Sequence, residues 1–161
     1  MGVVILGSKC TMTTQNKVER KIVLKNMLIC AWSTHSVSAL YLCIIWIFEY
    51  FCQYHFIDTD DDATWSTLQR VIKQSECPMP LLGRLNTFRN SLCHLNIRKS
   101  QDSVKRFTEF SLDEIKKMCY VFEDDADWFA ENIYYVFNCN YDFELFNNES
   151  KIQEPVKADS F

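Results

Sequence analysis

An uncharged apolar run near the start of the chain constrains most strongly what this protein can fold into. Residues Met27–Phe48 (MLICAWSTHSVSALYLCIIWIF) contain a single histidine, His35, and none of the four fully charged residue types. A helix over these residues would reach about 33 Å, which is about the thickness of the hydrocarbon core of a bilayer. The run therefore predicts one helix long enough to cross a membrane.

The charges on either side of the run predict its orientation. The basic residues before it are Lys17, Arg20, Lys21 and Lys25. The acidic residues after it are Glu49, Asp58, Asp60, Asp61 and Asp62. Because basic flanks stay in the cytoplasm, we expect everything after Cys52 to lie on the far side of the membrane. This predicts a secreted protein or a type II membrane-anchored one.

The run can be a cleaved signal, a retained anchor or a buried helix. Signal cleavage needs small residues after a short apolar core, but Phe48–Cys52 (FEYFC) is bulky. Cleavage near Ser36–Ala39 would leave nine apolar residues at a new N-terminus, so a retained anchor is slightly favoured. Met12 and Met27 are alternative start sites. The third alternative is a soluble fold that buries the run, because serines and His35 make its middle less apolar.

The remaining sequence divides by composition. The ranges are a basic N-terminal arm (1–26), the signal or anchor segment (27–48), an acidic linker (49–62), a helical domain (63–147) and a polar tail (148–161).

Apolar residues in the 63–147 range repeat with the period of a helix. The clearest faces are Trp65, Leu68 and Ile72, then Leu81, Leu85, Phe88, Leu92 and Leu95, and last Phe129, Ile133, Val136 and Phe137. Three glycines in the whole chain are few for the tight turns of a β-sandwich or a dinucleotide fold. We predict an all-α class, as a small up-down bundle of about four helices after the apolar segment.

One helix start is specified with particular clarity. Ser111 and Glu114 have the spacing of a capping box, in which each side chain accepts a hydrogen bond from the other residue's backbone N–H. Phe110 and Ile115 flank it as a hydrophobic staple, and Cys119 and Phe122 continue the inward face. The acidic run after Phe122, residues 123–127, is expected at the first turn of the next helix.

Half of the eight cysteines fall in the predicted helical domain, and we treat them as disulfide candidates: Cys77, Cys93, Cys119 and Cys139. A domain of this size buries only about 60% of its unfolded surface, so two disulfides would support it if it is exported. Three pairings are possible. Zinc is the competing interpretation, but the spacing lacks a C-x-x-C pair.

The motifs of common enzymes are missing from the sequence. It has no glycine-rich phosphate loop and no H-E-x-x-H motif, and His35, His55 and His94 are scattered. The acidic run Asp58–Asp62 lacks the glycine and the glutamate that a calcium loop requires. A net charge of −4 also disfavours nucleic acid as a partner. We expect no enzyme activity, no metal and no cofactor, and we expect a glycan at the Asn148 sequon after export.

The predicted helices resemble those of short-chain four-helix cytokines of the interleukin and colony-stimulating-factor type. Trp65, Leu68, Val71 and Ile72 in the first helix and residues 128–133 (WFAENI) in the last carry this resemblance. It implies receptor contacts on the outer helices, with Arg70, Lys73 and Glu131 as candidates. The leading hypothesis is an exported, cytokine-like receptor ligand. The alternatives are a membrane-anchored accessory protein without enzyme activity, held through Met27–Phe48, and a soluble intracellular helical interaction protein.

Overall fold

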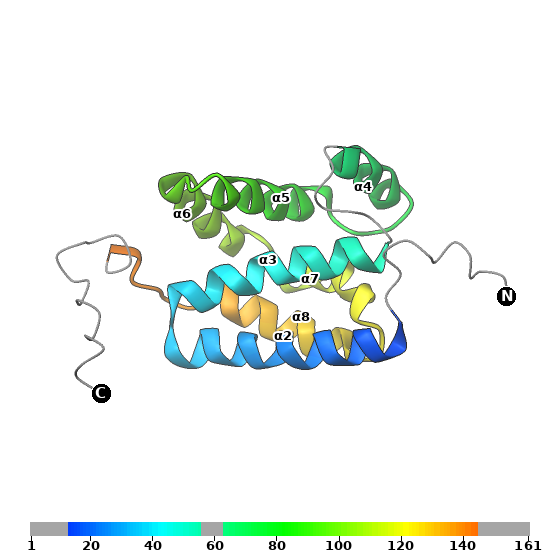
Figure 1. Cartoon of the computed structure of the whole chain (residues 1–161), viewed down its shortest axis with the longest axis horizontal. Helices are drawn as coiled ribbons and strands as arrows, with labels where there is room; N and C mark the ends of the chain where they lie inside the picture. Colours follow the sequence, from blue (N-terminus) through cyan, green and yellow to red (C-terminus); the bar gives the residue numbers. More distant parts are fainter. Residues whose placement is uncertain (1–12, 56–62, 145–161) are drawn as a thin grey trace, which may run out of the picture.

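The structure is a computed structural model that describes residues 13–55 and 63–144. Every regular element in these two ranges is a helix, which confirms the predicted all-α class (Figure 1). The second half of the predicted acidic linker (56–62), the polar tail and Asn148 lie outside the described residues.

The described residues form a series of α-helices with two short 3-10 segments. Their bounds are α2 Thr14–Thr34, α3 Val37–Tyr54, α4 Ala63–Lys73, α5 Met79–Cys93, α6 Ile97–Lys105, η1 Arg106–Glu109, α7 Leu112–Met118, η2 Cys119–Asp125 and α8 Ala126–Phe137.

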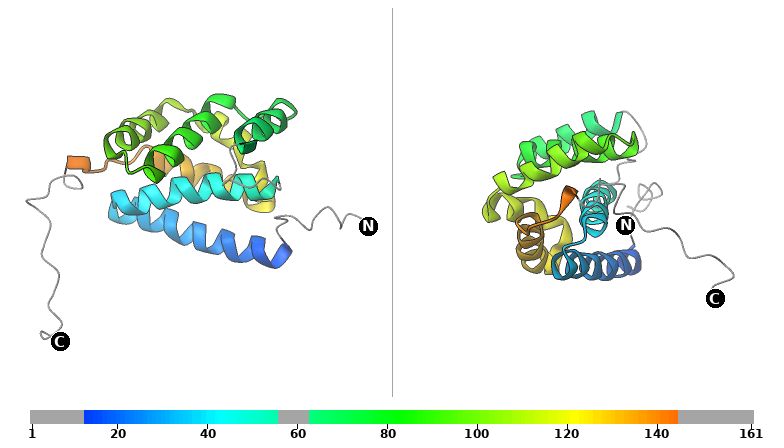
Figure 2. Two further views of the ribbon diagram at one scale, coloured as in Figure 1. Left: turned by 45° about the horizontal axis from the view of Figure 1, so that its top comes forward. Right: turned by 90° about the vertical axis from the view of Figure 1, so that its left-hand side faces the viewer.

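Helix α3 lies in the middle of the molecule, with α2 along one side, α8 along another and α5 above it (Figures 1 and 2). Cys43, Ile44, Phe51 and Cys52 of α3 are completely buried. These side chains share one hydrophobic core with residues of α2, α5, α7, η2 and α8. The apolar run and the predicted helical domain therefore pack together.

The predicted single helix over Met27–Phe48 is wrong, because the chain turns back at His35. Helix α2 ends at Thr34, whose hydroxyl donates to the Cys30 carbonyl over 2.6 Å. His35 then adopts the left-handed conformation (φ 57°, ψ 31°). Ser36 starts α3 as its N-cap, with its hydroxyl accepting from the Ala39 N–H. The run therefore folds as a hairpin of two helices.

Most of the predicted amphipathic faces are confirmed. Leu68, Leu81, Leu85 and Phe88 are fully buried, as are Phe129, Ile133 and Val136 of α8. Leu95 is the exception: it lies beyond the end of α5 with positive φ (56°) and is 80% exposed. The helical period predicted its face, but the helix ends before the residue is reached.

The predicted capping box at Ser111 is also confirmed. The Ser111 hydroxyl accepts from the Glu114 N–H over 3.2 Å, and the Glu114 carboxylate accepts from the Ser111 N–H over 3.0 Å. Both flanking apolar residues, Phe110 and Ile115, are buried. This cap fixes where α7 begins and thereby aims η2 and its aromatic residues at α3.

Helix α6 and the first half of α2 were not predicted from the sequence. Helix α6 occupies a stretch that reads as a polar connection, and it is capped by the Asn96 side chain. Its serines turn inward: Ser100 is fully buried and shares a 2.9 Å hydrogen bond with Ser91 of α5. The first half of α2 lies in the predicted basic arm, where Thr13 caps the helix by accepting from the Asn16 N–H.

Candidate functional site

The outer face of α2 carries aliphatic side chains that the rest of the fold leaves uncovered. Val18, Ile22 and Ile29 are 45%, 53% and 40% exposed. Their spacing of four and seven residues places them within about 40° of one another around the helix. Because α2 lies at the edge of the molecule in both orientations of Figure 2, this face points away from the core. We call these three residues the outer face of α2.

A groove of about 370 Å³ lies between α2 and α3, and its lining on α2 begins at Glu19, one residue after Val18 of the outer face. Its lining is half apolar and half polar: Glu19, Arg20, Val23, Leu24, Trp46, Glu49, Tyr50 and Gln53. Val23 is 50% exposed there, although Leu24 is buried. The volume falls within the range of small-ligand and side-chain pockets.

Hydrogen bonds organise the polar rim of the groove. Arg20 donates to the Gln53 side-chain carbonyl, and Gln53 donates to the Glu49 carboxylate over 3.0 Å. Glu19 accepts from Gln15 over 2.9 Å. The guanidinium of Arg20 is thus held against α3, and the two carboxylates, Glu19 and Glu49, stand on the two helices that border the groove.

Tyr50 is the one lining residue whose polar atom is buried and unsatisfied. It is 3% exposed, and its hydroxyl has no hydrogen-bond partner among the described residues. Burial, together with the nearby carboxylate of Glu123, raises the pKa of Tyr50. The ring stacks on Phe122 with centroids 4.8 Å apart, so the phenol stays neutral and serves mainly in packing.

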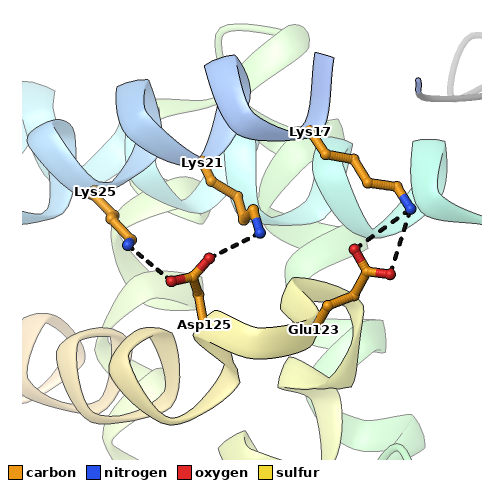
Figure 3. A network of polar contacts seen from close by, with 5 residues as sticks. All are labelled: Lys17, Lys21, Lys25, Glu123 and Asp125. Carbon is orange, nitrogen blue, oxygen red and sulfur yellow. Dashed lines mark hydrogen bonds and ion pairs between the residues drawn. The ribbon is translucent and has the colours of Figure 1, made fainter. Parts of the chain in front are cut away.

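An ion-pair network fixes α2 to the start of α8 (Figure 3). Lys21 and Lys25 contact the two oxygens of Asp125 at 2.8 and 3.0 Å, and Lys17 contacts Glu123 at 3.4 Å. The three lysines are four residues apart and so share one side of α2. Hydrogen bonds from Lys21 and Lys25 lower the pKa of Asp125. These five residues are called the ion-pair network below.

The backbone at Glu123 is unusual within this network. It has φ 53° and ψ −120°, a conformation that residues with a Cβ rarely adopt. The kink there turns the chain from η2 into α8 and directs the carboxylates of Glu123 and Asp125 toward α2. The prediction that this acidic run stands at the start of the next helix is confirmed, because Asp127 lies in the first turn of α8 and Asp125 is at its N-cap. In addition, Asp125 pairs with the lysines of α2.

A second polar contact lies at the C-terminal end of α3. The His55 ring lies 2.7 Å from the Tyr120 hydroxyl, and the rings of Phe51 and Tyr54 pack around the pair. Burial lowers the pKa of His55, so the imidazole is neutral near pH 7. Among the residues that the structure describes, no three histidines, cysteines or carboxylates gather as a metal site.

The predicted disulfides are not formed in the structure. All four candidate cysteines are free thiols: Cys77 and Cys119 are buried, Cys139 is half-buried and Cys93 is exposed. Burial raises the pKa of the Cys77 thiol to about 12 and raises that of Cys119 as well. The nearby Cys77 thiol adds to the effect of burial on the pKa of Cys119. Oxidative pairing of these four cysteines stays a prediction.

The predicted receptor contacts lie on two separate helices. Arg70 and Lys73 are exposed on α4, and Glu131 is exposed on α8. Figure 1 shows α4 at the upper right, beside the end of α5, and α8 below α3, so the fold does not bring these three residues together. The outer face of α2 is not predicted from the sequence, because the composition of residues 1–26 indicates a basic arm. The spacing of Val18, Ile22 and Ile29 was the signal that could have revealed it.

No protein-family model, curated protein or solved structure matches this chain.

The burial of the thiols predicts which of them react. Under native conditions Cys30 and Cys93, which are exposed, should be alkylated first. Cys43, Cys52 and Cys77, whose pKa burial raises to about 12, should react at least about 100-fold more slowly. Mass-spectrometric mapping of the labelled sites with time checks this order. Labelling of Cys77 at the rate of Cys93 would contradict the packing, and a site that labels only after reduction would reveal a disulfide.

Removing Asp125 should weaken the fold in a pH-dependent way. The pKa of Asp125 in the folded state lies below its ordinary value. Its ion pairs therefore stabilise the fold fully at a pH above the ordinary pKa, and this stabilisation is lost as the pH falls through the folded-state pKa. Asp125→Asn should lower the free energy of unfolding by about 1 kcal/mol at pH 7. The difference from the original chain should shrink toward zero at acidic pH and in high salt, as measured by urea denaturation.

The matched control is Asp102→Asn, on the exposed side of α6. It should leave stability nearly unchanged at every pH. An Asp125→Asn effect that is equal at pH 7 and at strongly acidic pH would show that the ion pairs do not stabilise the fold.

Proposed function

We propose that this chain is a protein-binding helical domain without enzyme activity, and that a partner helix binds along the outer face of α2 and the adjoining groove. The observation that carries the proposal is the regular exposure of Val18, Ile22 and Ile29 on one side of a helix. Single exposed aliphatic residues are ordinary on protein surfaces, whereas a row at helical spacing next to a groove is typical of helix-in-groove recognition.

The lining of the groove defines the chemistry of the partner. Val23 and the ring of Trp46 offer apolar contact for a large aliphatic or aromatic side chain. The charged residues of the lining are Glu19, Glu49 and Arg20, so its net charge is negative. A complementary partner is therefore an amphipathic helix with an apolar face bordered by lysine or arginine.

If the protein is a receptor ligand, it must be exported as well as bind a protein. The support for this role is the resemblance to short-chain cytokines and the Asn148 sequon. Because α2 and α3 carry much of the core, the form that fits this fold retains both helices after export. A membrane-anchored accessory protein is the second candidate, and it differs in that the run Met27–Phe48, which includes Ile29 of the outer face, spans the membrane.

Two designed peptides test the partner chemistry. One is an amphipathic leucine-lysine helix, and the other is a leucine-glutamate helix of equal length and apolar face. The leucine-lysine peptide should bind at least about tenfold more tightly in fluorescence polarisation, because the rim carboxylates attract one peptide and repel the other. Ile22→Asn should weaken its binding about tenfold through the lost apolar contact.

The matched control is Leu95→Asn, since Leu95 is the most exposed large apolar side chain in the described residues and lies far from α2 in the chain. It should leave the affinity unchanged. Equal binding of the two peptides, or binding that Ile22→Asn leaves intact, would rule out this face as the binding site.

A further inference from the structure

We propose that His35 and Ser36 form a hinge, and that in a membrane the α2–α3 hairpin straightens there into one spanning helix over Met27–Phe48. The hairpin is the form that the structure shows. The spanning helix is a second form of the same residues, with a lipid bilayer as its partner. This inference rests on the hinge and on the charge pattern, and it does not depend on the proposed protein partner.

The residue at the turn leaves both forms accessible. His35 has φ 57° and ψ 31°, a left-handed conformation that is disfavoured for every residue with a Cβ. Glycine would remove that penalty and would also weaken a continuous helix, so it would favour the hairpin on both counts. Histidine keeps the strain in the hairpin and is compatible with a straight helix.

With the hinge straight, the length of the uncharged run matches the thickness of a bilayer. The nearest charged residues are Lys25 and Glu49, and a continuous helix between them would reach about 35 Å, enough to cross the hydrocarbon core. In the hairpin the same run is divided between the end of α2 and α3. Helix α3 by itself is long and apolar enough to cross a membrane, and 61% of it is buried inside the fold.

Identifiable contacts hold the hairpin closed. The His35 ring donates to the Asn140 carbonyl over 2.8 Å, and the ion-pair network fixes the other half of α2 to Glu123 and Asp125. All three lysines of the network precede the uncharged run. After straightening they would therefore remain outside the hydrocarbon core, where anionic headgroups can replace the carboxylates.

A pair of substitutions at the hinge separates backbone preference from every other effect. His35→Ala and His35→Gly both remove the imidazole and its bond to Asn140. They differ in that alanine favours the straight helix and glycine favours the left-handed turn. The full chain is synthesised in the presence of microsomal membranes, and the fraction that resists carbonate extraction is measured. The ratio of inserted to extracted chain should be about tenfold higher for His35→Ala.

Glycosylation of Asn148 reports the orientation, and Asn148→Gln identifies the glycosylated band. The inserted fraction should carry the glycan, because the basic flank holds the N-terminus outside the lumen. Leu95→Ala and Leu95→Gly are the matched control, since Leu95 is also left-handed (φ 56°) but lies outside the run. This pair should insert equally.

Three results would overturn the hinge. The first is equal insertion of His35→Ala and His35→Gly. The second is release of all variants by carbonate, which would indicate attachment to the surface. The third is a glycosylated chain recovered in the soluble luminal fraction, which would identify the run as a cleaved signal. The first two results leave the expected binding of the leucine-lysine peptide to the folded domain unchanged, whereas the third would also remove the groove between α2 and α3.

Discussion

The rest of the structure depends on the burial of α3. This helix is too apolar to face water, and completely buried residues such as Ile44 and Phe51 occur along its length. Other helices cover it: the rings of Tyr41 and Phe88 of α5 pack with their centroids 5.1 Å apart, and the ring of Tyr50 stacks on that of Phe122 in η2. Because burial of apolar area is the dominant favourable term in folding, the arrangement of α2, α5, η2 and α8 follows from the need to enclose α3.

Ion pairs determine how α2 packs against α3. The helix has one side of lysines, an apolar side toward α3 and an outer face that still carries aliphatic residues. Pairing Lys21 and Lys25 with Asp125 fixes the rotation of α2 about its axis. This rotation leaves Val18, Ile22 and Ile29 outward, and it places Glu19 and Arg20 at the groove. The proposed partner face is thus a consequence of the ion-pair network.

The sequence predicts the elements whose signals are local and fails where the decision is tertiary. Helices α4, α5, α7 and α8 were predictable because their apolar residues repeat at helical spacing, and the Ser111 cap specifies its own boundary. Helix α6 was not, since its buried serines look like a solvated connection until Ser91 is there to pair with Ser100. The lysines before the apolar run fit a membrane flank equally well, and only the carboxylates of Glu123 and Asp125, a hundred residues later, show their role in the fold. The break at His35 has no glycine or proline to announce it.

Native-state hydrogen exchange tests the central claim, that α3 is the core of this fold, most directly. If α3 is enclosed by α2, α5 and α8, its backbone amides should be among the slowest to exchange, with protection equal to that of Ile133 and Val136 in α8. Rapid exchange throughout residues 37–54 while α5 and α8 remain protected would contradict the account. It would show that the domain folds without this helix.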